Sequence, residues 1–446
     1  MGELQEYASI SIVQEITPLS PQRPDENDRD AWKMFWIARK QGWRTEPEIS
    51  IERQQELEAR RAITPQLEKG IYPFKDFKLN RADVEWLLAT HDNGRGPVDA
   101  NDASQRARSG LDLRGADLCN VDLSNLPLAH LRGGPDHSER LTATLEQREM
   151  ASCHLRGANL RHTHLERASL GMADLRETNL RYAHLEEAFL FRGHFEGAYL
   201  YDTHLDGATL RHAFFDVTTT FHNTTLGSAY THAARLANIN WGGVNLLQID
   251  WDSIKILGDE LEARQKGSID GQVKNTEDML EDYRVAIQAN RQLAVTLQSQ
   301  GLNEDAARFA YRAQILQKDA SLDQMMMPGL THKQRLHAFQ KWFFSAFLYW
   351  ISGYGYKPGR SFLCYFLAIT GFATIYYLLG RSIGPALSPI GCFVLSMTSF
   401  HGRGFFPSGN IPLDNPITVL AAIEALFGLI IEATFIATLT KRLFNH

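Results

Sequence analysis

The chain has 446 residues, a net charge of −6 and 44% hydrophobic residues, which is enough length for about three domains. This ordinary charge balance excludes the strongly basic signature of a nucleic-acid-binding protein, so we expect no nucleic-acid partner. The four cysteines have no paired or metal-binding spacing, so no disulfide framework or zinc site is indicated. We find no nucleophile–base set and no phosphate-binding glycine loop, and therefore expect neither an enzyme nor a cofactor.

Residues 1–110 are expected to form a mainly helical region in the cytoplasm. The N-terminus lacks the basic start and apolar core of a signal peptide, so this region should stay inside the cell. Aromatic residues at helical spacing predict a helix in Asp28–Trp43, and further helices are predicted at Ile51–Ile63 and Arg81–Thr90. The tryptophans of the first helix are expected in a core or an interface, because large aromatic side chains usually pack there.

A period of five residues dominates 111–250. Leu or Phe occupies every fifth position from Leu155 to Phe215, and a small residue or a threonine stands two positions before each. Neither a helix nor a strand has this period. The pattern resembles the pentapeptide-repeat family, A-(D/N)-L-x-x. The resemblance implies a right-handed four-sided β-helix with 20 residues per coil and the bulky side chains inside.

An earlier block extends the repeat. It has leucines at 113, 118, 123 and 128, and 27 residues separate the last of these from Leu155. Residues 133–150 are therefore expected to form an insertion, with a short helix around 141–148. The coils should taper off by about residue 250.

A coil of 20 residues would stack six polar residues on one face. These residues are His164, His184 and His204, with Glu166, Glu186 and Asp206 beside them. Stacked like charges about 4.8 Å apart repel one another, and protonated imidazoles would relieve the repulsion. We expect a proton sensor or a divalent-cation site on this face, with a solvated polar ladder as the alternative.

Two helical segments follow the coils. In 251–330, apolar helical faces beginning near Asn275 and Asn303 predict a hairpin that is similar to one tetratricopeptide unit. A single unit rarely stands alone, so it should pack on the coils or on a neighbouring subunit. In 331–360, basic residues and a dense aromatic side predict a helix lying in the inner membrane interface; a buried core helix is the alternative.

The last segment, 361–446, contains two apolar runs that are each long enough to cross a membrane, 361–380 and 416–440. Between them, 387–400 is apolar but too short to cross, and a polar, glycine-containing stretch follows at 401–407. Non-helical backbone at membrane depth must be packed in protein or line water. We therefore expect an outer helix, a re-entrant pore helix, a filter-like loop and an inner helix. Flanking lysines and arginines place both ends in the cytoplasm.

This layout resembles the two-transmembrane channels of the potassium-channel superfamily, in which four subunits surround a pore. The family's filter motif, T-x-G-Y-G-D, is matched only in part. The implied pore residues are Thr398, Ser399, Phe400, His401, Gly402, Arg403 and Gly404. Because His401 and Arg403 interrupt the motif, potassium selectivity is not carried over. Gly353-Tyr354-Gly355 also looks like a filter, but it precedes the first crossing and is expected to be a turn.

Charged residues in the pore segment carry the functional hypotheses. An acid inside a membrane costs on the order of 3 kcal/mol unless it faces water or a partner. For Glu424 we favour a structural bond to the pore-helix region over a pore-facing position. The resemblance implies a gating hinge at Gly428 and a pore-lining acid at Glu432. Arg403 would favour anions if it faced the axis, but we favour a position in which it braces the filter.

We therefore expect a homotetrameric, plasma-membrane ion channel, of the bacterial inner membrane, that passes monovalent cations and is regulated by the cytoplasmic repeats. Its expected partners are copies of itself, the lipid bilayer, the permeant ions and an unidentified cytoplasmic regulator. The alternatives are an anion-selective channel and a membrane-anchored scaffold that does not conduct. Some pentapeptide-repeat proteins mimic DNA with an acidic surface, but seven arginines between Arg156 and Arg211 interrupt such a surface here.

Overall fold

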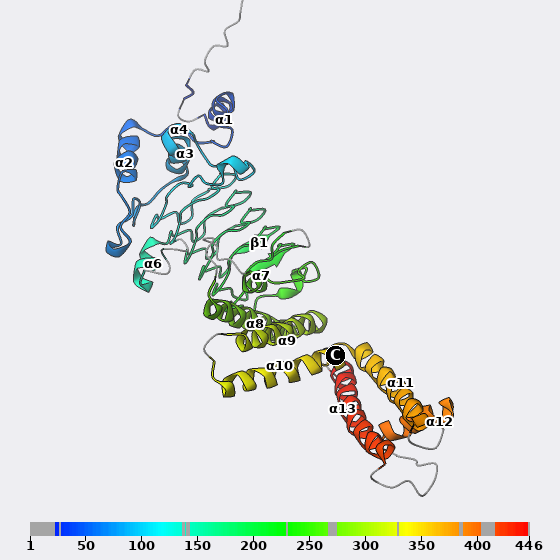
Figure 1. Ribbon diagram of the computed structural model, residues 1–446. Helices are drawn as coiled ribbons and strands as arrows, with labels where there is room; N and C mark the ends of the chain where they lie inside the picture. The colour runs from blue at the N-terminus through cyan, green and yellow to red at the C-terminus, as the bar shows by residue number, and fades with distance from the viewer. Residues whose placement is uncertain are drawn as a thin grey trace, which may run out of the picture.

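The structure is a computed structural model that describes residues 23–25, 28–135, 139, 143–228, 231–265, 274–327, 330–382, 387–402 and 415–444. The molecule is elongated, and its parts follow one another in chain order (Figure 1). Short helices occupy the N-terminal end, stacked coils form the middle, and a helical hairpin follows. The apolar helices lie at the opposite end.

The N-terminal helices cover the first coil. They are α1 (Arg29–Ala38), α2 (Ile51–Arg61), α3 (Arg81–Ala89) and α4 (His91–Gly94), with the 3-10 helices η1 (Leu67–Lys69) and η2 (Ala103–Gln105). α1 ends before the predicted boundary at Trp43, because Lys40 adopts a left-handed conformation that turns the chain. Leu57 and Val84 belong to the same buried cluster as the leucines of the first coil. These helices therefore cap the repeat, which would otherwise expose an apolar end.

The coils are joined by parallel bridges between residues 20 positions apart. In the main run, four ladders pass through His154, Asn159, His164 and Ser169. The strands β1 (Tyr199–Tyr201) and β2 (Thr220–His222) pair in parallel in one of them. The earlier block bridges to the main run across the insertion, for example from Asp117 to His154. The insertion carries α6 (Leu145–Ala151), which starts later than the predicted helix because Thr144 caps it.

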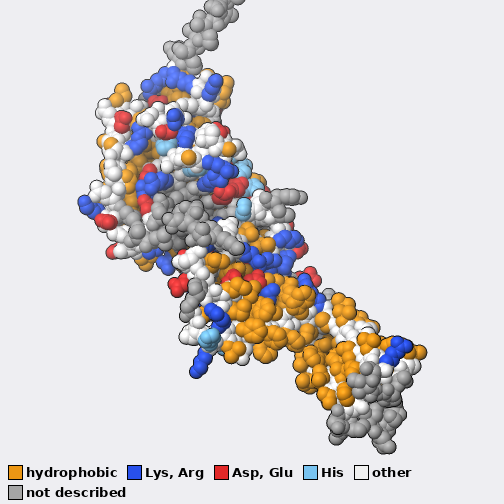
Figure 2. All heavy atoms as spheres, viewed as in Figure 1, with side chains coloured by type: hydrophobic (Ala, Val, Ile, Leu, Met, Phe, Trp, Pro, Cys, Tyr) orange, Lys and Arg blue, Asp and Glu red, His pale blue; other side chains and the backbone are white. Residues whose placement is uncertain are grey.

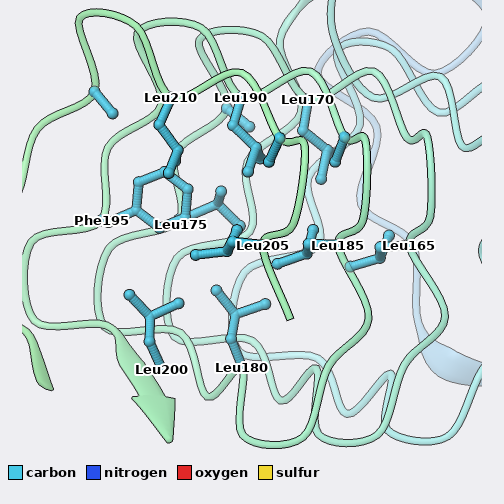
Figure 3. Packing of buried hydrophobic residues seen from close by; sticks show 14 of the residues in the cluster. Leu165, Leu170, Leu175, Leu180, Leu185, Leu190, Phe195, Leu200, Leu205 and Leu210 are labelled. Atoms are coloured by element: carbon cyan, nitrogen blue, oxygen red, sulfur yellow. The ribbon is translucent and has the colours of Figure 1, made fainter. Parts of the chain in front are cut away.

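The repeated Leu and Phe residues fill the interior of the coils (Figure 3). Leu165, Leu185 and Leu205 form one row along the stack, and each is at most 1% exposed. Full burial of such a side chain contributes about 1.5–3 kcal/mol. The alanines and threonines two positions earlier are buried as well, and their small size leaves room for the leucines.

The hairpin packs on the last coil. After η3 (Leu246–Gln248) come α7 (Gly258–Arg264), α8 (Thr276–Ser299) and α9 (Asn303–Met325). Asn275 caps α8 by accepting a hydrogen bond from the backbone N–H of Asp278 at 2.8 Å. The rings of Trp251 and Phe309 meet edge to face with their centroids 6.0 Å apart. One apolar core thus continues from the coils into the hairpin.

Ion pairs reinforce this joint. Arg211 Nε lies 2.7 Å from Asp259 Oδ1, and Arg235 Nε lies 2.6 Å from Glu262 Oε2. Burial raises the pKa of Glu262, but Arg211 and Arg235 outweigh burial and hold that pKa below its ordinary value of 4.5. The carboxylate of Glu262 is therefore part of what holds the hairpin to the coils.

The C-terminal part consists of α10 (His332–Ser352), α11 (Pro358–Ser382), α12 (Pro389–Phe400) and α13 (Pro416–Phe444). α11 and α13 contain 24-residue and 25-residue stretches that are long and apolar enough to cross a membrane. α11 begins at Pro358, because proline favours the first turn of a helix. Residues 358–360 therefore belong to α11 and not to the predicted interfacial segment. Gly353 and Tyr354 are both left-handed and form the predicted turn after α10.

Candidate functional site

The candidate site lies where α11, α12 and α13 pack together (Figure 1). Ser388 caps α12 by accepting a hydrogen bond from the backbone N–H of Gly391 at 3.1 Å. Of the predicted pore residues, Thr398, Ser399 and Phe400 form the last turn of α12, and His401 and Gly402 follow it. Arg403 and Gly404, and with them most of the loop 401–407, lie outside the described residues.

Glu424 connects all three helices. Its side chain is fully buried. Tyr376 of α11 donates its hydroxyl to Glu424 Oε2 at 2.7 Å, and Ser396 of α12 donates its hydroxyl to Oε1. A buried carboxyl group without donors would be costly, and the two hydroxyl groups offset that cost. The structure thus places Glu424 against the short helix α12.

Gly428, one turn further along α13, lies against the end of α12. A Cβ atom at this position would be 2.8 Å from the carbonyl carbon of Phe400 and still closer to its oxygen. No larger residue fits without separating the two helices. Close helix crossings in membranes commonly rely on such small residues. The gating hinge at Gly428 remains a prediction.

Glu432, one turn further again, lies beside His401. Glu432 Oε1 is 3.3 Å from His401 Nε2, and its side chain is 37% exposed. Tyr365 Oη lies 3.3 Å from the same imidazole nitrogen, and His401 Nδ1 lies 2.7 Å from the carbonyl oxygen of Met397. The side chain of Glu432 is therefore partly exposed, whereas that of Glu424 is fully buried.

A second cluster joins the hairpin to the apolar helices. Arg360 at the start of α11 donates to the carbonyl oxygen of Tyr349 at 3.2 Å, and its guanidinium lies 4.9 Å from that ring. The amine of Lys357 lies 5.0 Å from the ring of Tyr311 in α9. The basic residues at the start of the first predicted crossing thus contact α9 and α10.

Hydrophobic surface extends over α10 and the helices beyond it (Figure 2). The large exposed side chains of α10 are Leu336, Phe339, Phe343, Phe344, Leu348 and Trp350. The exposed basic residues Lys333, Arg335 and Lys341 lie on the same helix. Monomeric soluble proteins rarely expose apolar patches of this extent.

The six ladder residues are adjacent on the coils. The imidazole rings of His164, His184 and His204 stack with centroids 4.9 Å apart at both steps. Nδ1 of His164 lies 2.7 Å from Glu166 Oε1, and Nδ1 of His184 lies 3.1 Å from Glu186 Oε1. The hydrogen bond to Glu166 raises the pKa of His164 above its ordinary value. Asp206 accepts hydrogen bonds from Thr225 and Thr231, and the hydroxyl of Thr225 also lies 3.3 Å from Nδ1 of His204.

Sequence reasoning missed Tyr376, Ser396 and Tyr365, which hold the two glutamates and His401. The available signal was indirect: an acid in an apolar run needs polar partners, and these hydroxyl groups interrupt neighbouring apolar runs. Their pairing depends on how each helix is rotated.

Comparison with known proteins identifies the central segment. A family model described as pentapeptide repeats matches residues 153–190 in eight copies, which confirms the predicted repeats in that stretch. No protein with a curated description matches the chain.

Several solved structures are similar in part. HetL, a pentapeptide repeat protein involved in heterocyst differentiation regulation in the cyanobacterium Nostoc, is 22% identical over 29% of this chain and 54% of its own, with a TM-score of 0.14. A pentapeptide repeat protein of the Arabidopsis thaliana thylakoid lumen is 21% identical over 26% of this chain and 68% of its own, also with a TM-score of 0.14. A plasmid-mediated fluoroquinolone resistance protein is 13% identical over 32% of this chain and 76% of its own, with a TM-score of 0.18. The chain spans about half the length of the first of these.

Proposed function

We propose that this chain is one subunit of a homotetrameric ion channel of the plasma membrane, regulated by its cytoplasmic pentapeptide repeats. In this proposal α11 is the outer helix, α12 the re-entrant pore helix, 401–407 the filter-like loop and α13 the inner helix. The repeats form a right-handed four-sided β-helix, and both termini lie in the cytoplasm of a bacterial cell. The proposal includes no catalytic activity.

The observation that carries the proposal is the way α12 is held. This helix has 12 residues and is too short to cross a bilayer, yet it packs between two helices that are long enough to cross. The buried carboxyl group of Glu424 and the close approach at Gly428 fix it there. A simple membrane anchor needs none of these contacts, whereas a pore helix must be held at a fixed depth. This favours the channel over a non-conducting scaffold.

Monovalent cations are the proposed permeant ions. The C-terminal end of α12 carries the negative end of the helix dipole, which attracts cations. Glu432 lies beside this end and is partly exposed. Four copies around one axis would bring four helix ends and four carboxylates together. Arg403 is proposed to brace the filter and not to face the axis. Its positive charge would then not offset the negative potential of these helix ends and carboxylates.

The proposed regulation would act through contacts that connect the coils to the outer helix. The core of the coils continues into α8 and α9, and α9 contacts the start of α11 through Tyr311 and Lys357. α10 would lie on the inner surface of the bilayer, with its aromatic side chains in the lipid. Movement of the repeats would then reach the outer helix through a packed path.

Ion selectivity tests this assignment. Reversal potentials are measured in bilayers under asymmetric KCl and NaCl for the wild type and for Glu432→Gln. We expect Glu432→Gln to reduce the preference for cations over anions, and Glu281→Gln, on the exposed surface of α8, to leave it unchanged. An anion-selective wild type would refute the proposed ion. Equal selectivity in wild type and Glu432→Gln would remove the assigned role of Glu432.

In the same assay Arg403→Gln separates the two positions considered for that arginine. If Arg403 braces the filter, charge selectivity persists while the tetramer becomes less stable. If it faces the axis, its removal increases the preference for cations.

A further inference from the structure

We propose that Glu166, His184 and Glu186 form a binding site for a divalent cation of the Zn²⁺ class on the cytoplasmic coils. One ligand atom from each of the three residues lies within 4.8 Å of the other two. The residues come from equivalent positions of adjacent coils, which the bridge between His164 and His184 holds side by side. This site is separate from the candidate pore and does not depend on the proposed function.

Both glutamates have an oxygen that lacks a partner. In each, Oε1 faces the Nδ1 atom of the histidine two residues earlier. In each, Oε2 is shielded from solvent and has no hydrogen-bond partner among the described residues. A shielded carboxylate oxygen without a donor is costly, and two such groups on adjacent coils also repel each other. A cation held between Glu166 and Glu186 would relieve both effects.

The neighbouring arginine is engaged elsewhere. Arg167 follows Glu166 in the chain, but its Nε donates to Glu187 Oε2 of the next coil at 2.7 Å. The next step of the ladder differs, because the two oxygens of Asp206 accept hydrogen bonds from Thr225 and Thr231. Within this ladder, the uncompensated carboxylate oxygens among the described residues therefore lie at the step between the first two histidines.

The donor set indicates the class of ion. Two carboxylate oxygens and one imidazole nitrogen suit zinc and similar transition metals, whereas calcium and magnesium prefer oxygen ligands alone. The three residues are only partly buried, so water can complete the coordination. His164, bonded to Glu166, would hold that carboxylate in place without touching the metal.

The chain provides a matched control at another face. His194 and Glu196 repeat the same geometry, with Nδ1 3.1 Å from Oε1 and a shielded Oε2 without a partner. The equivalent positions of the adjacent coils hold Arg176 and Asp216, whose side chains are engaged by Asp174 and by threonines. Among the described residues, no group of three or more potential metal ligands includes Glu196. Glu196→Gln thus changes the same kind of pair outside the site.

The experiment is a titration of the full-length protein in detergent with ZnCl₂ by calorimetry, with CaCl₂ as a comparison. The wild type and Glu196→Gln should bind zinc with the same affinity and calcium more weakly. Glu186→Gln should bind zinc about tenfold or more weakly, because it loses a ligand. His184→Gln provides a second variant if Glu186→Gln does not fold. Zinc should also raise the unfolding temperature of the wild type but not of either site variant.

Three results would overturn the proposal. The first is equal zinc affinity in the wild type and in a folded Glu186→Gln or His184→Gln variant. The second is absence of zinc binding by the wild type, which would leave a shared proton as the occupant of the face. The third is sulfur ligation in the X-ray absorption spectrum, because the chain has four cysteines but the proposed site offers only nitrogen and oxygen.

Discussion

Replacing Gly428 by alanine tests whether α12 is seated against α13. The added carbon would lie 2.8 Å from the carbonyl carbon of Phe400 and 3.2 Å from its Cα. Carbon atoms pack without strain at about 3.5–4.0 Å, and the carbonyl oxygen of Phe400 is closer still, so the two helices must separate by more than about 0.7 Å. The same change at Gly371 of α11 places the new carbon in open space, with no atom within 4 Å. Gly371→Ala is therefore the matched control.

The magnitude follows from two opposing effects. Overpacking costs about 1–3 kcal/mol, and alanine gains about 0.5–1 kcal/mol over glycine inside a helix. At Gly428 the clash outweighs the gain, and we expect a net loss of about 1–2 kcal/mol. At Gly371 only the gain remains. A flexible hinge at Gly428 without the contact to Phe400 would instead give the two variants similar stabilities.

Cys392 offers a direct assay, because it lies on α12 and is 1% exposed. In a Cys119→Ser, Cys364→Ser background, maleimide labels Cys392 only when α12 opens, since the fourth cysteine is buried inside the coils. A loss of 1–2 kcal/mol should speed labelling by about 5–30-fold in Gly428→Ala. Labelling of Gly428→Ala that is no faster than that of Gly371→Ala would refute the described packing of α12.

Three further predictions concern stability. Tyr376→Phe removes a donor from the buried carboxyl group of Glu424 and should cost about 1–3 kcal/mol, measured with the same thiol assay; unchanged labelling would exclude this bond. Leu185→Ala should lower the free energy of unfolding in urea by about 2–5 kcal/mol, because Leu185 is 1% exposed. Val217→Ala, at a position that is 75% exposed, should change it by less than about 0.5 kcal/mol. The pKa of Glu262 is held below 4.5, so its stabilising effect is present above that pH and is lost as the pH falls through the lowered pKa. Glu262→Gln should therefore flatten the loss of stability below about pH 4.5, measured by thermal unfolding; an unchanged acid profile would contradict this.

The coils could be predicted because the spacing of their interior residues is a local sequence pattern. Each five-residue repeat places one large side chain inside the coils. The spacing from Leu155 to Phe215 therefore identifies the interior residues directly. The insertion at 133–150 was visible as a break in the same spacing. The sequence did not show how this insertion affects the stacking of the coils. The bridges in the structure, such as that between Asp117 and His154, show that the coils continue in register.

Contacts between elements were harder to predict. An apolar helix face does not identify its partner, and nothing in the spacing of Leu57 or Val84 indicated that they share a core with the coils. Likewise, the cost of an acid in an apolar run predicts that Glu424 has partners but not that they are Tyr376 and Ser396. That pairing is set by the rotation and depth of three helices, which depend on the packing of the whole unit.

We propose that the segment between α11 and α13 forms a conducting pore. Current recordings from the purified, folded protein in planar bilayers with a KCl gradient test this most directly. We expect discrete currents whose reversal potential lies toward the equilibrium potential of K⁺. Protein that is inserted and folded but carries no current under any ionic condition would contradict it.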